Sequence, residues 1–542
     1  MNSNKKNKGK TMNTSRKNKS VWPLLMGLGL TGCFGVNWNE LGDTWDTDVV
    51  ATNDAVYAIL PISEQLIKIT TDGYYNVVDL NGAEPKSLVA SPDGTRLLVF
   101  SDWESCSLDD KDIKVVSDCP DEELQVVSEL AVIENGVSVN TYEVPSHLNT
   151  VSFSEDGNIA VAYLLASDVS NIQIDGFADL GEVAFINLQE AAAPDNPQSL
   201  SVGFSPTRIL FSPNDQAIVM SRSQVVGVDL QSFSKVLEAP MTLDADDSVD
   251  PSGAELAYDP DTDALTLLLT VDNSQDLYML DLQTEYWNIG DLGAVPSDIG
   301  VDDLTSQSVF VFSGSSKVTI LDHSALSTLN NSSLYEISLE QAANKSKIGD
   351  GFALLYNDQN SYVHDVYHLD LNTRDLTEFV IANPLYDLLL SDSGSFAVGL
   401  MEPESSYSSG VDAYQDARYG VAVFDLVNQE ITNLVAESMP IGVELIENEN
   451  GAFALALLEG VDTLLQVDLN NPSRSTEIEL PAPPVTIGSM PDGRFVISHQ
   501  VSMGMISILD PNNPEQLTTI SSFAAAGLMA EDELVQRNSE GE

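Results

Sequence analysis

From about residue 55 onward, short apolar runs alternate with acidic or glycine-containing turns. Each unit has a turn, a run of small and branched apolar residues, and a second short run that usually ends in Asp-Leu. This sequence pattern occurs nine times after the first sixty residues. The clearest units open with the turns Ser91–Gly94, Ser154–Gly157, Ser212–Asp215, Ser391–Gly394 and Met490–Gly493. Short apolar runs bounded by tight turns predict strands rather than helices.

Each unit has room for four short strands. In one unit the strands are expected at residues 386–390, 395–400, 421–426 and 431–435, and in the next at 442–446, 452–458, 464–469 and 475–480. Runs such as 265–271 are almost continuously apolar, which indicates strands that are covered on both faces. A repeating unit of roughly 40 to 60 residues built from such strands is typical of a β-propeller blade.

The hairpins formed by second and third strands number ten. They are expected near residues 55–69, 96–134, 158–188, 216–230, 264–282, 308–322, 352–371, 395–426, 452–469 and 494–510. Ordinary single propellers have about four to eight blades. We therefore expect an all-β propeller of four-stranded antiparallel blades and favour one ring of seven or eight, with some hairpins as insertions. Two propellers or one unusually large ring are the alternatives.

The Pro-Asp-Gly turns resemble those of TolB-like and lactonase-type propeller repeats, and more distantly those of WD repeats. The Gly-His and Trp-Asp pairs of true WD repeats are missing. The turn glycines Gly94, Gly157, Gly394 and Gly493 are expected to have positive φ, and the preceding Asp to bond the turn backbone. These residues are interpreted as structural.

The first 32 residues have the order of an export signal. Seven basic residues precede an apolar stretch, Val21–Leu30, that is too short to span a bilayer. It ends in Leu30-Thr31-Gly32-Cys33, which resembles the lipobox of bacterial lipoproteins and implies a lipid anchor on Cys33. A cleaved signal with an incidental cysteine is the alternative. We expect a signal peptide at 1–32, a linker at 33–45, the propeller at 46–520 and a C-terminal segment and polar tail at 521–542.

Phe34, rather than Asp, follows the lipobox cysteine. By analogy with bacterial lipoproteins, this argues against retention in the inner membrane. We therefore expect a lipoprotein of the cell envelope, at the outer membrane and facing either the periplasm or the surface.

The charge of the chain is strongly negative. Residues 1–32 hold seven of the 23 Lys and Arg and none of the 83 Asp and Glu, which leaves 16 basic against 83 acidic residues and a formal net charge of −67. Such a field repels phosphate backbones and excludes nucleic acid as a favoured partner, whereas cations and basic proteins are attracted. The acids are dispersed, so adaptation to salt is the simpler interpretation.

Two cysteines remain when Cys33 carries lipid. In an exported protein, Cys106 and Cys119 are expected to form a disulfide that closes the acidic loop Ser107–Asp118. No nearby histidine or third cysteine completes a zinc set in the sequence.

Three long insertions between second and third strands are expected on one face of the ring, at residues 102–129, 166–181 and 401–419. Aromatic residues in or beside them are of the kind enriched in binding surfaces. The candidate binding residues are Trp103, Tyr407, Tyr414 and Tyr419. Loops that only cap the ring are the alternative.

One acidic turn resembles a calcium loop. Asp259, Asp261 and Asp263 alternate as its ligands do, but Ala264 and Thr270 stand where an EF-hand needs Gly and Glu. Calcium at these three residues is the one cofactor considered, and a solvated turn is the alternative. Acidic clusters at 43–48 and 244–250 are weaker candidates.

The sequence gives little support for a catalytic site. His364 and His368 lie in a strand-like run, where four residues span about 13 Å, too far for one metal ion. Neither a Gly-x-Ser-x-Gly elbow nor a phosphate loop occurs, and the apparent dinucleotide motif at 27–32 lies in the export signal.

The favoured function is that of a non-enzymatic, lipid-anchored envelope propeller that binds a protein or glycan through the face that carries the insertions. The alternative is a metal-dependent lactonase or hydrolase with its site in the central channel. A structural subunit of an envelope assembly is a third interpretation. No catalytic residue is assigned.

Overall fold

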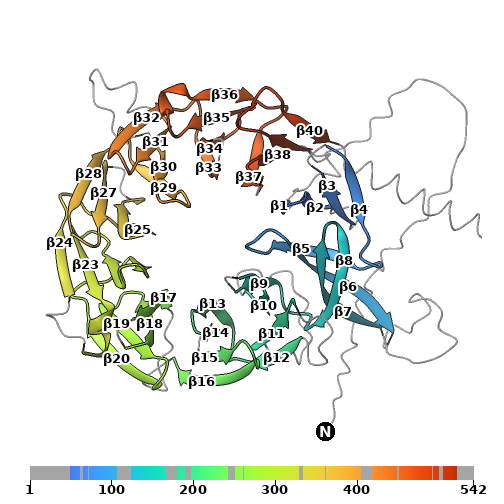
Figure 1. The fold of residues 1–542 in the computed structure, drawn as a ribbon, viewed down its shortest axis with the longest axis horizontal. Coiled ribbons are helices and arrows are strands. Elements are labelled where there is room, and N and C mark those ends of the chain that lie inside the picture. The colour runs from blue at the N-terminus through green and yellow to red at the C-terminus, as the bar shows by residue number, and fades with distance from the viewer. Residues whose placement is uncertain are drawn as a thin grey trace, which may run out of the picture. The chain divides into compact units, whose positions relative to one another are not determined.

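The computed structural model describes residues 49–521, except 61–64, 71–72, 107–123, 155, 166–179, 190–196, 222, 242–250, 261, 329–333, 360–361, 404–417, 449–450, 491 and 500–504. These residues lie in one unit, Thr44–Glu542. They form ten antiparallel sheets of four consecutive strands each. Figure 1 shows the sheets following one another around a ring, with the first strand of a blade toward the middle and the fourth outside, as for β33 and β36.

The strands fall into four sets by their position in the blade, from the middle of the ring outward. The first strands are β1 (Val49–Ala51), β5 (Glu84–Ala90), β9 (Thr150–Phe153), β13 (Pro206–Ser212), β17 (Pro251–Asp259), β21 (Asp298–Asp302), β25 (Lys345–Gly349), β29 (Leu385–Leu390), β33 (Pro440–Asn448) and β37 (Pro484–Ser489). The second strands are β2 (Val56–Leu60), β6 (Leu97–Cys106), β10 (Ile159–Tyr163), β14 (Gln216–Ser221), β18 (Ala264–Val271), β22 (Gln307–Val311), β26 (Phe352–Tyr356), β30 (Phe396–Met401), β34 (Gly451–Leu458) and β38 (Phe495–His499). The third strands are β3 (Gln65–Ile69), β7 (Leu124–Glu134), β11 (Glu182–Asn187), β15 (Gln224–Asp229), β19 (Asp276–Asp281), β23 (Lys317–Asp322), β27 (Asp365–Asp370), β31 (Gly420–Asp425), β35 (Thr463–Asp468) and β39 (Met505–Leu509). The fourth strands are β4 (Tyr75–Val78), β8 (Val137–Val144), β12 (Gln198–Ser201), β16 (Ser234–Pro240), β20 (Tyr286–Asp291), β24 (Leu334–Ser338), β28 (Leu376–Val380), β32 (Glu430–Val435), β36 (Thr476–Glu479) and β40 (Thr518–Ser521).

The predicted propeller of four-stranded antiparallel blades is confirmed. Every one of the ten predicted hairpins is the middle pair of a blade, so the ring has ten blades rather than the favoured seven or eight. The larger count was set aside because ordinary rings are smaller. No hairpin among the described residues is a mere insertion into another blade.

The turns between first and second strands have the predicted structure. Ser91 Oγ donates to Asp93 Oδ1 over 2.6 Å, and the same carboxylate oxygen accepts the backbone N–H of Thr95 at 3.1 Å. Gly94 has a φ of 64°, and Gly157, Gly394 and Gly493 likewise have positive φ. In the Ser91–Gly94 turn, the Asp93 side chain therefore accepts hydrogen bonds that stabilise the turn, and glycine allows the left-handed backbone conformation.

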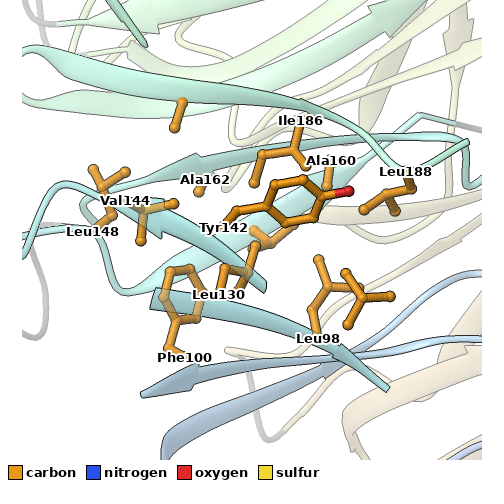
Figure 2. Close-up of a cluster of buried hydrophobic side chains, with 13 residues drawn as sticks. Leu98, Phe100, Leu130, Tyr142, Val144, Leu148, Ala160, Ala162, Ile186 and Leu188 are labelled. Atoms are coloured by element: carbon orange, nitrogen blue, oxygen red, sulfur yellow. The ribbon is translucent and has the colours of Figure 1, made fainter. Parts of the chain in front are cut away.

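Apolar side chains fill the space between neighbouring blades. Figure 2 shows one such core, where Leu98 and Leu130 of blade 2 face Ala160 and Ile186 of blade 3; all four have no measurable exposure. The second and third strands are buried almost throughout, as in β14 and β15, because both of their faces pack on other blades. Their nearly continuous apolar runs follow from this burial.

In the described residues, a shared side-chain core closes the ring between blades 1 and 10. Val56 and Ile67 of blade 1 share a buried core with Ile506, Ile508 and Ile520 of blade 10. In the described residues, each sheet consists of four consecutive strands, so no strand of blade 1 completes the sheet of blade 10.

Helical structure is confined to short turns in the part of the chain that is described. Two 3-10 helices occur there, η4 (His323–Thr328) and η5 (Pro472–Arg474). Neither is long or apolar enough to cross a bilayer.

Candidate functional site

One face of the ring carries the connections between second and third strands and those from each blade to the next. This follows from the antiparallel order of the strands, and we call it the loop-bearing face. The opposite face carries the Pro-Asp-Gly turns. Three long connections begin and end on the loop-bearing face, between β6 and β7, between β10 and β11, and between β30 and β31, as predicted.

The inner strands are bulged where they start at the loop-bearing face. In six blades of the described chain, the pairing between first and second strand shifts and leaves one extra residue on the first strand. The extra residues are Lys86, Thr207, Ser252, Tyr386, Ile441 and Val485. A bulge leaves its extra residue without a ladder partner and redirects the side chain. Tyr386 is half-buried, and the other five side chains are exposed.

Proline accounts for most of these bulges. In five of the six blades, the residue before the extra one is a proline, namely Pro85, Pro206, Pro251, Pro440 or Pro484. Proline has no N–H to donate to the ladder and is found in sheets at strand starts, edges and bulges. The sixth bulge follows Leu385, which itself follows Pro384.

In blade 2 the bulge residue is a cation with a partner. The Lys86 ammonium lies 3.6 Å from the Asp102 carboxylate, and Ser128 Oγ donates to the other oxygen of Asp102 at 2.5 Å. Beyond this pair, β6 and β7 continue past the start of β5 as a two-stranded ribbon from Trp103↔Val127 to Cys106↔Leu124.

The predicted insertion at 102–129 was wrong at both ends, because residues 102–106 belong to β6 and residues 124–129 belong to β7. The polar and acidic composition there hid the pairing, which needs only backbone bonds. Trp103 lies on this ribbon rather than in a loop, and its side chain is 40% exposed. It remains accessible, as a binding residue requires.

In blade 8 the bulge residue is aromatic. The Tyr386 hydroxyl donates to the carbonyl of Pro440, so its side chain reaches from blade 8 to blade 9. Burial raises the pKa of Tyr386, and the nearby Asp387, Tyr419 and Glu402 raise it further. The structure therefore brings Tyr419, a predicted binding residue, close to Tyr386, whereas Trp103 lies in another part of the ring.

The other predicted residues of the N-terminus and the insertions lie outside the described residues. They are Cys33, Cys119, Tyr407 and Tyr414. Cys106 is the last residue of β6. The lipid anchor and the disulfide stay predictions.

The predicted calcium loop connects β17 to β18. Asp259 is buried and accepts a hydrogen bond from Thr262 Oγ1 at 2.6 Å, and Asp263 accepts one from the Tyr258 hydroxyl at 2.9 Å. Asp261 lies outside the described residues. Within the described ranges, no three His, Cys, Asp or Glu side chains are placed to share a metal ion. Calcium at this turn stays a prediction.

The histidines support the packing between strands. His323 Nδ1 donates to the Tyr258 carbonyl over 2.8 Å, and Nε2 lies 3.0 Å from Ser308 Oγ. His499 makes the same kind of pair with Ala482 and Ser507. Burial lowers the pKa of both imidazoles. All five histidines are described, and none lies on a first strand.

Polar side chains link several first strands to the next. Arg208 of blade 4 pairs with Glu255 of blade 5 at 2.9 Å. Asp298 of blade 6 accepts the N–H and hydroxyl of Ser346 of blade 7 at 2.7 and 2.8 Å. Burial raises the pKa of Glu255 although Arg208 lowers it. These bonds fix the spacing of the inner strands and so the positions of the bulges.

The bulge residues were not predicted from the sequence. Tyr386 and Ile441 belong to first strands that were expected to start at residues 386 and 442. The repeated proline before the extra residue is the signal that could have identified them.

A ten-bladed β-propeller with a bulged inner rim is the class of protein that these features define. No protein-family model matches the chain, and the search of curated proteins gave no match. Among solved structures, the chain is similar to the dihydro-heme d1 dehydrogenase NirN, with 11% identity, 73% of this chain and 71% of the other covered, and a TM-score of 0.40.

Two further structures illustrate the range of these similarities. A eukaryotic initiation factor is 12% identical over 74% of this chain and 93% of the other, with a TM-score of 0.41. Streptogramin B lyase is 14% identical over 56% of this chain and 92% of the other, with a TM-score of 0.29. At these identities and scores, no ligand or activity is transferred to this chain.

Proposed function

We propose that this protein is a lipid-anchored β-propeller of the bacterial cell envelope that binds an envelope protein or glycan through its loop-bearing face, without catalysis. The observation that carries the proposal is the coincidence of six bulges and three long connections on that one face. Bulges redirect side chains at the rims of closed sheets, and loops on a rigid scaffold commonly carry binding residues.

A binding role suits the chemistry of the inner wall. Several of its polar side chains are engaged with neighbouring blades, as in the Arg208–Glu255 and Asp298–Ser346 bonds. An enzyme of the lactonase kind would need acids or histidines that converge on the axis. The histidines instead lie on the second and third strands or the connections. The net charge disfavours nucleic acid as the partner.

The test of binding is to shorten the longest connection of blade 8. Met401 and Gly420 belong to β30 and β31, so residues 404–417 can be replaced by a short Gly-Ser linker without cutting the sheet. We expect chemical crosslinking in envelope extracts to lose its specific adduct. The control replaces residues 190–196, which connect β11 to β12 on the opposite face. Unchanged adducts in the first variant would exclude the 404–417 connection as a binding element.

The anchor has its own test. Cys33→Ala should move the protein from the membrane fraction to the soluble fraction, because acyl chains on Cys33 supply the proposed attachment. A protein that still sediments with membranes after this change would refute the lipid anchor. The outer-membrane location is then checked by density-gradient separation of the wild type.

The proposed disulfide is tested by thiol labelling. Cys106→Ser should leave one alkylatable thiol at Cys119 in the exported protein, where the wild type should have none. Labelling of two thiols in the wild type under denaturing, non-reducing conditions would rule the disulfide out.

A further inference from the structure

Three consecutive blades carry apolar or aromatic bulge residues. Blades 8, 9 and 10 have Tyr386, Ile441 and Val485 at the bulge, whereas the bulge residues of the other three bulged blades, Lys86, Thr207 and Ser252, are polar. Ile441 is 41% and Val485 44% exposed. We call Tyr386, Ile441 and Val485 the apolar arc.

The members of the arc are neighbours in space. Their strands β29, β33 and β37 follow one another along the inner side of the ring (Figure 1). The hydrogen bond from Tyr386 to the Pro440 carbonyl ends at the residue before Ile441, so the first two members adjoin. β33 and β37 are in direct contact, which brings Ile441 and Val485 to equivalent places on adjacent strands. The arc is therefore one surface.

Carboxylates stand beside the arc. Glu402 follows β30 and donates its N–H to the Pro384 carbonyl at 3.0 Å, and Glu459 follows β34 and donates its N–H to Met439 at 2.7 Å. Each acid is thus held beside the start of a bulged strand. No lysine or arginine among the described residues forms an ion pair with either of them.

Blade 2 has an ion pair between its bulge residue and a carboxylate of the same blade, and blades 8 and 9 lack a cation at the bulge. There, Asp102 of β6, which stands opposite the start of β5, is paired with the bulge residue itself, Lys86. In blades 8 and 9 the bulge residue is Tyr386 or Ile441, so the corresponding acid has no cation from the bulge of its own blade. A partner that supplied the cation would complete the same pair from outside.

There is also room beside the arc. A Cβ atom at Gly442, which follows Ile441, would meet no heavy atom within 4 Å, and the same holds at Gly488 on β37. Side chains of a partner can therefore approach the inner strands at Gly442 of blade 9 and Gly488 of blade 10 without moving neighbouring atoms of this protein.

We propose that the apolar arc binds a peptide segment of a partner protein in which apolar side chains alternate with Lys or Arg. The apolar side chains would cover Ile441 and Val485, and the cations would pair with Glu402 and Glu459. This inference rests on the proposed function, since it gives the chemistry of the partner for the same face. Apolar burial supplies the affinity, and the charges select a basic segment.

The test uses two labelled synthetic peptides, one alternating Lys with Leu and Phe and one with Glu in place of each Lys, in fluorescence anisotropy with the full protein. We expect the Lys peptide to bind and the Glu peptide not to bind. In the Ile441→Ser, Val485→Ser double variant, the dissociation constant for the Lys peptide should rise about tenfold, as loss of roughly two partly buried side chains implies.

The matched control is Val427→Ser. Val427 is 73% exposed in the turn between β31 and β32, on the face opposite the arc. Its loss should leave the dissociation constant unchanged. An equal dissociation constant for the wild type and the double variant would overturn the proposal, because the peptide would then bind through net charge alone. Binding of the Glu peptide as tightly as the Lys peptide would also overturn it.

A blocking variant covers the case in which the serine variants fold poorly. Gly442→Trp fills the open space beside Ile441, and Gly442 does not have a positive φ that would strain the substitution. We expect native thermal stability and loss of peptide binding; retained binding in this folded variant contradicts the inference.

The inference and the function can fail separately. When the 404–417 replacement abolishes partner crosslinking but Gly442→Trp leaves both crosslinking and peptide binding intact, the face binds a partner of other chemistry and the arc proposal falls. When neither change affects crosslinking, the function falls as well.

Discussion

The Arg96 guanidinium joins blades 2 and 3 at the face that carries the Pro-Asp-Gly turns, opposite the loop-bearing face. Its Nη1 donates to the carbonyl of Gly157 at 3.1 Å, in the Pro-Asp-Gly-type turn of blade 3, while its Nε donates to Glu134 of blade 2 at 3.1 Å. The side chain is only 17% exposed. A positive-φ glycine of one blade is therefore held by the cation of the blade before it.

Arg96→Met should lower the free energy of unfolding by about 1.5 to 3 kcal/mol, because it removes a charged donor from two partly buried acceptors. Urea denaturation followed by circular dichroism measures the change. Lys317→Met is the control: Lys317 pairs with Glu336 with both side chains more than half exposed, so we expect a loss below about 1 kcal/mol. Equal losses would mean that Arg96 acts only as a surface charge.

The closure of the ring should be its weakest joint. Between all other neighbours the chain runs directly from one blade to the next, so a lost contact is restored by a tethered partner. In the part of the chain that the structure describes, blades 1 and 10 share a core that includes Ile508 and have neither a common sheet nor a direct chain connection.

Ile508→Ala should therefore raise hydrogen exchange in β1 to β4 and β37 to β40 ahead of the rest. The matched variant is Ile320→Ala, in the core between blades 6 and 7. Both side chains are buried, with exposures of 2% and 0%. Each change should cost about 2 to 5 kcal/mol, but only the first should open the ring locally. Uniform exchange in both variants would show that closure is as strong as the other joints.

The sequence predicted the blades well because their signals are local. In blade 8 the expected strands at 386–390 and 395–400 match β29 (Leu385–Leu390) and β30 (Phe396–Met401) within one residue. Turn residues and apolar runs report the conformation of their own segment.

Ring size and the inner rim were harder to predict. The number of blades depends on how the sheets pack around the ring. The usual size of propellers favoured seven or eight blades, although the sequence has ten hairpins. A bulge depends on the register between two strands, so the apolar side chain of Ile441 did not indicate that it stands out of the ladder. Only the proline before it, Pro440, is a signal in the sequence. The pairing of β6 with β7 through Trp103 and Cys106 was missed because backbone bonds leave no apolar pattern.

Glu444 on β33 provides a test of the inner wall by pH. Burial raises the pKa of its carboxyl, although hydrogen bonds from Ser489 of blade 10 lower it. The folded protein therefore keeps this proton to a higher pH than the unfolded chain does. Ionisation of Glu444 costs stability as the pH rises from the unfolded value, about 4.3, through the folded value.

Glu444→Gln removes this dependence. Relative to the wild type, the variant should gain stability as the pH rises above about 4, until Glu444 is ionised in the folded protein, since Gln has no charge to desolvate. Urea unfolding at several pH values gives the difference. Glu430→Gln, at an exposed position on β32, is the matched control for the loss of one carboxylate. A difference for Glu444→Gln that does not change with pH would mean that folding does not raise the pKa of this carboxyl.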